Sequence, residues 1–305
     1  MASPISNFLD LTIAGLIVKL RLAFGVRPML FQRLINSVPL WILVLGVVAI
    51  FELYSVGLML ACRTKWGPDR LKLNNEVAGF KFSVIGVLYA VLLAFLVVTV
   101  WQNYNATEIA VRNEAKAVGD LTQLSYALPE DEGSAIRLAL SDYVNDVRQT
   151  EWVTMAQGLP SKTTADALAH LTEAIFNVHA EQLRDHALFQ QALHLLALIE
   201  DNRNERLDSS DGSVPPILWF VLIAGASITL GYPAFFGTSN PVAQTLMTVA
   251  LAALVALALV PAMILDFPFT GQAALTSGDF DEALQQMPPH LKGHPLTGNE
   301  ENLSR

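Results

Sequence analysis

The stretch NNEVAGFKFSVIGVLYAVLLAFLVVTVW, residues 74–101, decides the fold of this chain. Its last part, from Phe82 to Trp101, contains no charged residue and no proline. An α-helix needs about 20 apolar residues to cross about 30 Å of hydrocarbon. The stretch therefore predicts a membrane-spanning helix.

Small residues recur on one face of this helix. Alternating steps of four and three connect Gly79, Ser83, Gly86, Ala90, Leu93 and Val97. Small side chains let two membrane helices approach closely. We expect this row to line a pore or to form a helix interface at an oligomer axis. The alternative, packing inside the chain's own bundle, stays open.

Three further apolar runs have the length of a membrane span, and the chain is 52% hydrophobic but only 15% charged. These runs are Pro39 to Cys62, Ile217 to Phe236 and Val242 to Leu265. The pattern predicts an all-α, polytopic membrane protein with four transmembrane helices in a 2+2 arrangement. We expect membrane lipid as a partner and a multi-pass position in the cell (inner) membrane.

Composition shifts divide the chain into five segments. We expect an amphipathic N-terminal segment (residues 1–38), followed by a first transmembrane pair (39–101) and an acidic helical insert outside the membrane (102–214). A second transmembrane pair (215–265) and a polar tail beginning with DFPFTG (266–305) complete the chain. The first segment has short apolar and basic patches and lacks the features of a cleavable signal peptide. We expect it to lie in the membrane interface, with a short re-entrant helix or a fifth membrane helix as the alternative.

The insert carries most of the negative charge. Residues 103–214 hold 18 Asp and Glu against 8 Lys and Arg. This excess excludes nucleic acid as an expected partner, since phosphate backbones bind basic surfaces. The carboxylates are expected on solvated helix surfaces.

The helical pattern of the second span continues past Trp101. No proline occurs before Pro129, and the same spacing selects Val100, Tyr104, Thr107, Val111, Glu114, Val118 and Leu121. One helix is therefore expected to run from the membrane into the insert. Further apolar periodicities predict a helix bundle there, in which Thr163 or Thr164 caps one helix, and a short helix at Asp279 to Gln286.

Glu52 is an ionisable residue near the middle of the first span. A charge at this depth is costly, so it is a candidate functional residue. No Lys, Arg or His lies inside the other three spans to pair with it. It is either a neutral glutamic acid bonded within the bundle or a residue that affects ion permeation.

Sequence signals for catalysis and cofactors are missing. The chain has no phosphate-binding glycine loop, nucleophile elbow or zinc motif, and a single cysteine, Cys62. The histidines at 170, 179, 186 and 194 are not spaced as helix metal ligands. We expect no enzyme activity, no cofactor and no metal. Basic residues flank both ends of the spans, so the side of the membrane that holds the insert stays open.

Three short motifs within this layout resemble those of the bacterial bestrophin-like domain family. They are NNEVAGF at residues 74–80, Glu151-Trp152 in the insert, and DFPFTG at residues 266–271. The likeness covers roughly residues 40–287. The family residues are Asn74, Asn75, Gly79, Asp266, Pro268, Phe269 and Gly271.

The resemblance extends more remotely to the bestrophins, which are pentameric anion channels with an apolar neck formed by the second membrane helix. It implies a homo-oligomer, inorganic anions as partners, and the helix at residues 82–101 around the pore. The neck residues of bestrophins are bulky, so Val84, Leu88 and Val91 form an alternative neck face. The resemblance implies no calcium site, because Gln272 to Leu275 lacks the acidic cluster of calcium-sensing members.

Two functions follow as hypotheses. The first is an oligomeric ion channel of bestrophin type. The second is a non-conducting membrane scaffold or sensor whose acidic insert binds a partner. The second membrane helix separates them, because a channel needs an axial path that water can enter.

Overall fold

The computed structural model describes residues 38–73, 75–179, 183–285 and 287. The predicted N-terminal segment, Asn74 and the end of the tail lie outside these residues. All the regular elements in the described part of the chain are helical, as the sequence predicts. Among these described residues, four stretches are long and apolar enough to cross a membrane, and they correspond to the four spans that the sequence predicts.

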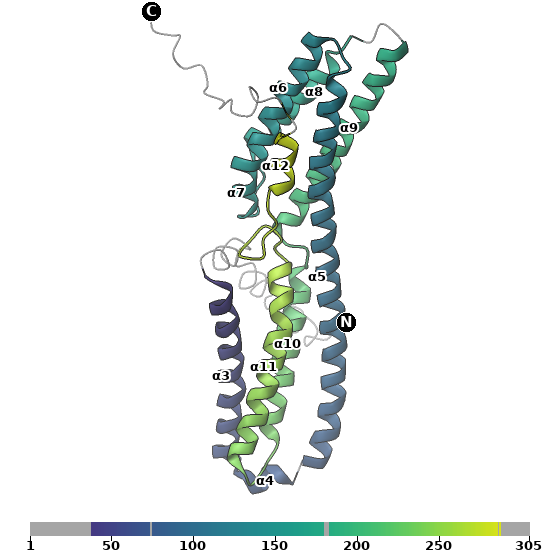
Figure 1. Cartoon of the computed structure of the whole chain (residues 1–305). Coiled ribbons are helices and arrows are strands. Elements are labelled where there is room, and N and C mark those ends of the chain that lie inside the picture. Colours follow the sequence, from purple (N-terminus) through teal and green to yellow (C-terminus); the bar gives the residue numbers. More distant parts are fainter. Residues whose placement is uncertain (1–37, 74, 180–182, 286, 288–305) are drawn as a thin grey trace, which may run out of the picture. The chain divides into compact units, whose positions relative to one another are not determined.

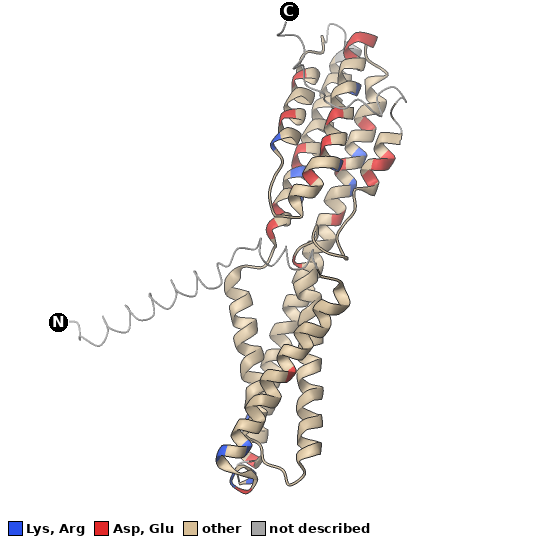
Figure 2. Ribbon diagram, turned by 90° about the vertical axis from the view of Figure 1, so that its left-hand side faces the viewer, with Lys and Arg blue, Asp and Glu red and all other residues tan. Residues whose placement is uncertain are grey.

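The chain forms two compact units, each described here by itself. The apolar unit comprises the residues up to Tyr104 together with Gly212–Ala273. The acidic unit comprises Asn105–Asp211 and the residues from Ala274 onward. Figure 2 shows that charged residues are frequent on the helices of the acidic unit and rare along those of the apolar unit.

Helix α3 (Leu40–Trp66) begins the described part of the apolar unit. It ends at Gly67, whose positive φ of 75° terminates the helix, and Pro68 then starts the short helix α4 (Pro68–Lys72). Helix α5 (Asn75–Ser125) is continuous over 51 residues and contributes to both units (Figure 1). The predicted continuation of the second span is therefore confirmed.

The second transmembrane pair consists of α10 (Pro216–Gly231) and α11 (Pro241–Leu265), joined by a 3-10 turn, η3 (Tyr232–Phe235). Asn240 caps α11 by accepting hydrogen bonds from the next two helical amides. The core of this unit is formed by one face each of α5, α10 and α11, with residues such as Leu93, Leu222 and Leu259. Helix α3 packs mainly along α11.

The described residues of the acidic unit form the second part of α5 and shorter elements: α6 (Glu130–Asp146), the π-helix η1 (Val147–Glu151), α7 (Trp152–Met155), α8 (Lys162–Phe176), α9 (Leu183–Asp208), the 3-10 turn η2 (Ser209–Asp211) and α12 (Gly278–Gln285). The short helix predicted near residue 279 is confirmed as α12. Its Phe280 is fully buried.

Two details of the acidic unit differ from the sequence-based expectation. Ser161, and not Thr163 or Thr164, caps α8, because its extended backbone lets its hydroxyl accept the Thr164 amide. The π-helix η1 was not expected, since its wider turn depends on contacts made after folding.

Candidate functional site

Helix α5 has two different apolar faces within the apolar unit. One face packs in the core and includes Tyr89, Leu93 and Leu96. Val84, Leu88 and Val91 lie on other faces and are 49%, 66% and 50% exposed. Phe95 and Val98 continue this exposed row with the same four-three spacing. The row is thus available to contact lipid, another subunit or a pore.

The predicted row of small residues is divided by this packing. Leu93 lies in the core, and Val97 packs against it. Ser83 and Ala90 are exposed, while Gly79 and Gly86 are half-buried. A methyl group added to either glycine would meet no atom within 4 Å. The structure therefore brings the first four residues of the row, Gly79 to Ala90, to an open surface. It brings the last two, Leu93 and Val97, into the chain's own bundle.

Glu52 lies on the packed face of α3 and is half-buried. Steps of three and four connect it to Ser55 and Met59, which are both buried. The Ser55 hydroxyl donates to the Leu230 carbonyl at 3.0 Å, and Met59 contacts Thr248 at 3.5 Å. Within the described residues, the Glu52 carboxyl has no hydrogen bond or ion pair. It is thus a half-buried carboxyl without a protein partner among those residues.

Asn75 and Asp266, two of the family-motif residues, hold the ends of the apolar unit. The Asn75 amide donates to the Gly237 carbonyl at 2.7 Å and accepts from the Gly237 amide at 2.9 Å. A side chain at Gly237 would clash with the backbone of Lys72 at 2.4 Å. The first motif therefore fixes the turn between α10 and α11 against α4.

Asp266 is almost fully buried and accepts four hydrogen bonds. Its Oδ1 accepts from the amides of Ser213 and Val214, both at 2.9 Å, and from the Ser213 hydroxyl. Its Oδ2 accepts from the Trp219 indole at 3.0 Å. These bonds tie the end of α11 to the entry of α10. Next to it, Phe267, Phe269 and Thr270 are buried, and Gly271 adopts a positive φ, so this motif also has a structural role.

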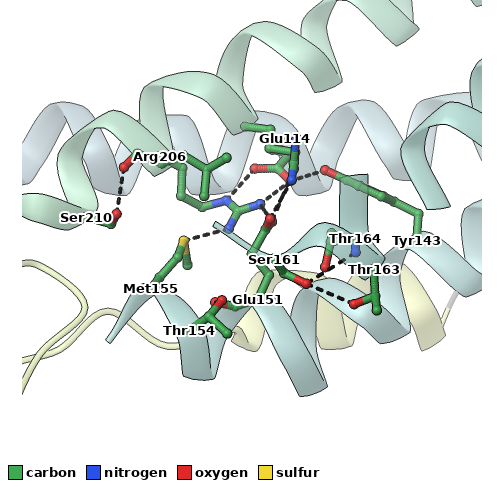
Figure 3. A network of polar contacts seen from close by, with 12 residues as sticks. Glu114, Tyr143, Glu151, Thr154, Met155, Ser161, Thr163, Thr164, Arg206 and Ser210 are labelled. Carbon is green, nitrogen blue, oxygen red and sulfur yellow. Dashed lines mark hydrogen bonds and ion pairs between the residues drawn. The ribbon is translucent and has the colours of Figure 1, made fainter. Parts of the chain in front are cut away.

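A buried ionic network lies in the core of the acidic unit (Figure 3). Arg206 binds Glu114 through two hydrogen bonds of 2.7 and 2.9 Å and also binds Glu151 at 2.8 Å. Arg203 binds Glu151 at 2.5 Å. All of these side chains except Arg203 are fully buried, and Arg203 is nearly so. Two carboxylates and two guanidinium groups balance in charge.

Other side chains complete the network. The Tyr143 hydroxyl donates to Glu114 at 2.7 Å. Burial, and then the negative charge of Glu114, raise the pKa of Tyr143 well above its usual range. Burial alone would lower the pKa of Arg206, but Glu114 and Glu151 outweigh it and raise that pKa. Trp152 and Phe280 lie 5.5 and 5.9 Å from the Arg206 guanidinium.

The expectation that the carboxylates of the insert lie on solvated surfaces is wrong for Glu114 and Glu151. Their burial is possible because arginines distant in the sequence compensate their charge. Glu114 does fall on the predicted apolar row of α5, which was the only sequence signal for its burial. The four histidines are exposed, and the described residues hold no group of three His, Cys, Asp or Glu side chains that could bind a metal.

A family model for the bestrophin-like domain matches residues 46–280. The chain belongs to the bestrophin-like domain family. The matched range includes most of both units and both Glu151 and Asp266. A membrane protein with a bestrophin-like fold is therefore established, and the predicted membership of this family is confirmed.

Solved structures with this bestrophin-like fold include variants of a bacterial bestrophin homologue from Klebsiella pneumoniae. One has 13% sequence identity and a TM-score of 0.61, covering 82% of this chain and 99% of that chain. A second has 15% identity and a TM-score of 0.62, covering 82% and 98%. Another structure of the homologue has 15% identity and a TM-score of 0.60, covering 82% and 99%. At such identities the likeness extends to the fold alone. No curated protein matches the chain.

Proposed function

We propose that this bestrophin-like chain is the subunit of an oligomeric ion channel in the inner membrane, with α5 around a central pore. The exposed apolar row of α5 carries this proposal, because it lies outside the face that packs in the chain's own core. Rings of Val84, Leu88 and Val91 from several subunits would form a narrow apolar neck. Such a constriction conducts when wetted and closes when it loses water.

The small residues at the beginning of α5 support close approach of neighbouring subunits. Gly79, Ser83, Gly86 and Ala90 leave this surface without bulky side chains, which favours helix–helix contact in a membrane. Five subunits and anion selectivity rest on analogy with the bestrophins. Glu52 would favour cations if it were ionised and faced the pore, whereas a neutral Glu52 leaves anion conduction intact.

The first experiment measures the mass of the purified full chain in detergent and then records currents in a planar bilayer with asymmetric chloride. We expect an oligomer that conducts ions, with a reversal potential that reports its selectivity. A monomer, or an oligomer without current for any common ion, refutes the channel.

A matched pair of substitutions tests the neck. Leu88 and Leu246 are 66% and 70% exposed, but they lie on different helices, α5 and α11. Leu88→Ala should raise the conductance or open probability several-fold because it widens and wets the constriction, whereas Leu246→Ala should leave both unchanged. Equal currents in the two variants would show that this face of α5 lies outside the pore.

Two further variants assign the other candidate residues. Replacing Gly86 and Ala90 with Leu should disrupt the oligomer or the conductance. An unchanged oligomer mass and an unchanged conductance would show that this surface forms neither the subunit interface nor the pore. Glu52→Gln should alter the ion preference or the pH response of the current if the carboxyl affects permeation. An identical current–voltage relation at all pH values assigns it to bundle packing.

The charge distribution of the acidic unit favours one alternative, a non-conducting scaffold that binds a basic partner. The buried network uses two charges of each sign, so the excess of acidic residues in the insert lies elsewhere in that unit. Salt-sensitive capture of a lysine-rich protein, together with an absence of current, would support this function.

A further inference from the structure

A cavity of about 520 Å³ lies within the apolar unit. It is bordered by the first turns of α5, the η3 turn and the first turns of α11, and it is open on one side. Phe82, Met247 and Leu251 give it apolar walls, and Thr238 and Gln244 add polar groups. Ligand sites in proteins commonly have volumes of about 300–1,000 Å³. A group of the size of a water molecule occupies roughly 30 Å³, and a methylene group has a similar size. The cavity can therefore hold on the order of 15 methylene groups.

Arg63 places a positive charge beside this cavity. Its Nη1 donates to the Thr238 carbonyl at 3.1 Å and to the Gln244 side chain at 2.8 Å. Both residues also line the cavity. Gln244 is held in place by a further bond from its Nε2 to the Phe236 carbonyl at 2.8 Å. The guanidinium is thus held in place directly behind two residues that line the cavity.

The charge of Arg63 has no counter-ion among the described residues. Its two acceptors are neutral, and none of the described carboxylates forms an ion pair with it. The side chain is half-buried, and a partly desolvated charge without a partner is unfavourable. Lys72, by comparison, pairs with Asp69 at 3.2 Å. An anion bound beside Arg63 would compensate this cost.

We propose that the cavity holds an acyl chain of an anionic phospholipid whose phosphate lies against Arg63. The occupant needs an apolar part of about one acyl chain and a negative group at its end, and lipid supplies both in a membrane. The sequence from Arg63 to Phe82 has five basic and two acidic residues, so this end of the unit attracts anionic headgroups.

Native mass spectrometry of the purified full chain tests the proposal with added phosphatidylglycerol, phosphatidylcholine or inorganic phosphate. We expect the chain to retain phosphatidylglycerol and to bind phosphatidylcholine about fivefold more weakly, as expected for the loss of one charge contact near a membrane surface. Inorganic phosphate should not displace the lipid. Equal retention of both lipids, or displacement by phosphate alone, overturns the proposal.

Two pairs of variants locate the site. Gly79 lines the cavity, and Gly57 lies on α3 away from the lining residues; an added methyl group meets no atom within 4 Å at either. Gly79→Leu should fill the cavity and remove most of the bound phosphatidylglycerol, whereas Gly57→Leu should retain it. Arg63→Gln should reduce the preference for phosphatidylglycerol about fivefold, whereas Arg70→Gln should keep it.

The melting temperature of each variant separates loss of lipid from loss of folding, and the Arg63 pair gives a second test if Gly79→Leu does not fold. Wild-type lipid retention in a folded Gly79→Leu or Arg63→Gln variant refutes the site. A Gly79→Leu variant that changes the oligomer mass and still retains lipid shows that another subunit occupies the cavity. None of these measurements depends on whether the protein conducts ions.

Discussion

Substitution of Glu114 with Gln should strongly destabilise the acidic unit, although the two side chains have nearly the same shape. Glu114 accepts two hydrogen bonds from Arg206 and one from Tyr143, and it is fully buried. Glutamine keeps one acceptor but places an amide donor against the guanidinium. The network then carries one uncompensated positive charge.

The expected cost follows from the burial of this charge. Removal of one partner from a buried ion pair costs about 3–5 kcal/mol. A change of about 1 kcal/mol lowers the melting temperature of a protein of this size by roughly 2–4 °C. We therefore expect Glu114→Gln to melt on the order of 10 °C below the wild type. The assay is thermal unfolding of the purified full chain in detergent.

The same helix supplies a matched control. Glu108 forms an ion pair with Arg112 on the surface of α5, where the Arg112 side chain is exposed and the Glu108 side chain is half-buried. An exposed pair contributes only about 0–1 kcal/mol because water solvates the separated charges. Glu108→Gln should therefore shift the melting temperature by a few degrees at most. Equal shifts for the two variants would refute the argument that the buried charge balance stabilises this unit.

A double variant tests the charge balance directly. Arg206→Met alone leaves one excess negative charge, and the combination of Glu114→Gln with Arg206→Met restores neutrality. We expect the double variant to be more stable than the sum of the two single changes predicts, with a coupling of about 1–3 kcal/mol. Additive losses would contradict a shared network.

Two further predictions concern a close backbone contact and a pH dependence. Gly237→Ala should lower the melting temperature by several degrees, because the new methyl group would lie 2.4 Å from the Lys72 amide nitrogen. In the control Gly86→Ala, the new methyl group meets no atom within 4 Å, so this variant should be as stable as the wild type or slightly more stable. Similar shifts of the melting temperature in the two variants would contradict the crowding at Gly237. Burial, and then the charges of Asp142 and Glu151, raise the pKa of Asp146. The ionised form is therefore disfavoured in the folded state, so its cost is fully present above the raised folded pKa and disappears as the pH falls below the ordinary value of 3.8. Asp146→Asn should melt about 1–3 °C above the wild type at pH 7.5, and the difference should narrow at pH 4.5; a difference that stays constant between the two pH values would refute it.

Local patterns determined most of the fold. The four spans follow from runs of apolar residues, and the length of α5 follows from the absence of proline between Pro68 and Pro129. The row predicted from Val100 onward lies inside the fold: Tyr104 is half-buried, and the others are buried, namely Val100, Thr107, Val111, Glu114, Val118 and Leu121. Such signals are readable because hydrophobic periodicity and helix-breaking residues act over a few turns.

The face of α5 that packs could not be predicted in the same way. Nearly all side chains of this span are apolar, so periodicity does not distinguish a core face from a lipid or pore face. The structure selects Tyr89, Leu93 and Leu96 for the core because α10 and α11 pack against them. Tyr89 fits there because Gly225 on α10 has no side chain to displace its ring.

The sequence alone thus determined the helical membrane architecture of this protein and its membership of the bestrophin-like domain family. Only the tertiary structure decided which charges lie inside, since Glu114 and Arg206 are 92 residues apart and Glu151 and Arg203 are 52 apart. A single carboxylate in a helical pattern is normally solvated. It can be buried only when folding brings a guanidinium group within hydrogen-bond distance, and no local pattern encodes that pairing.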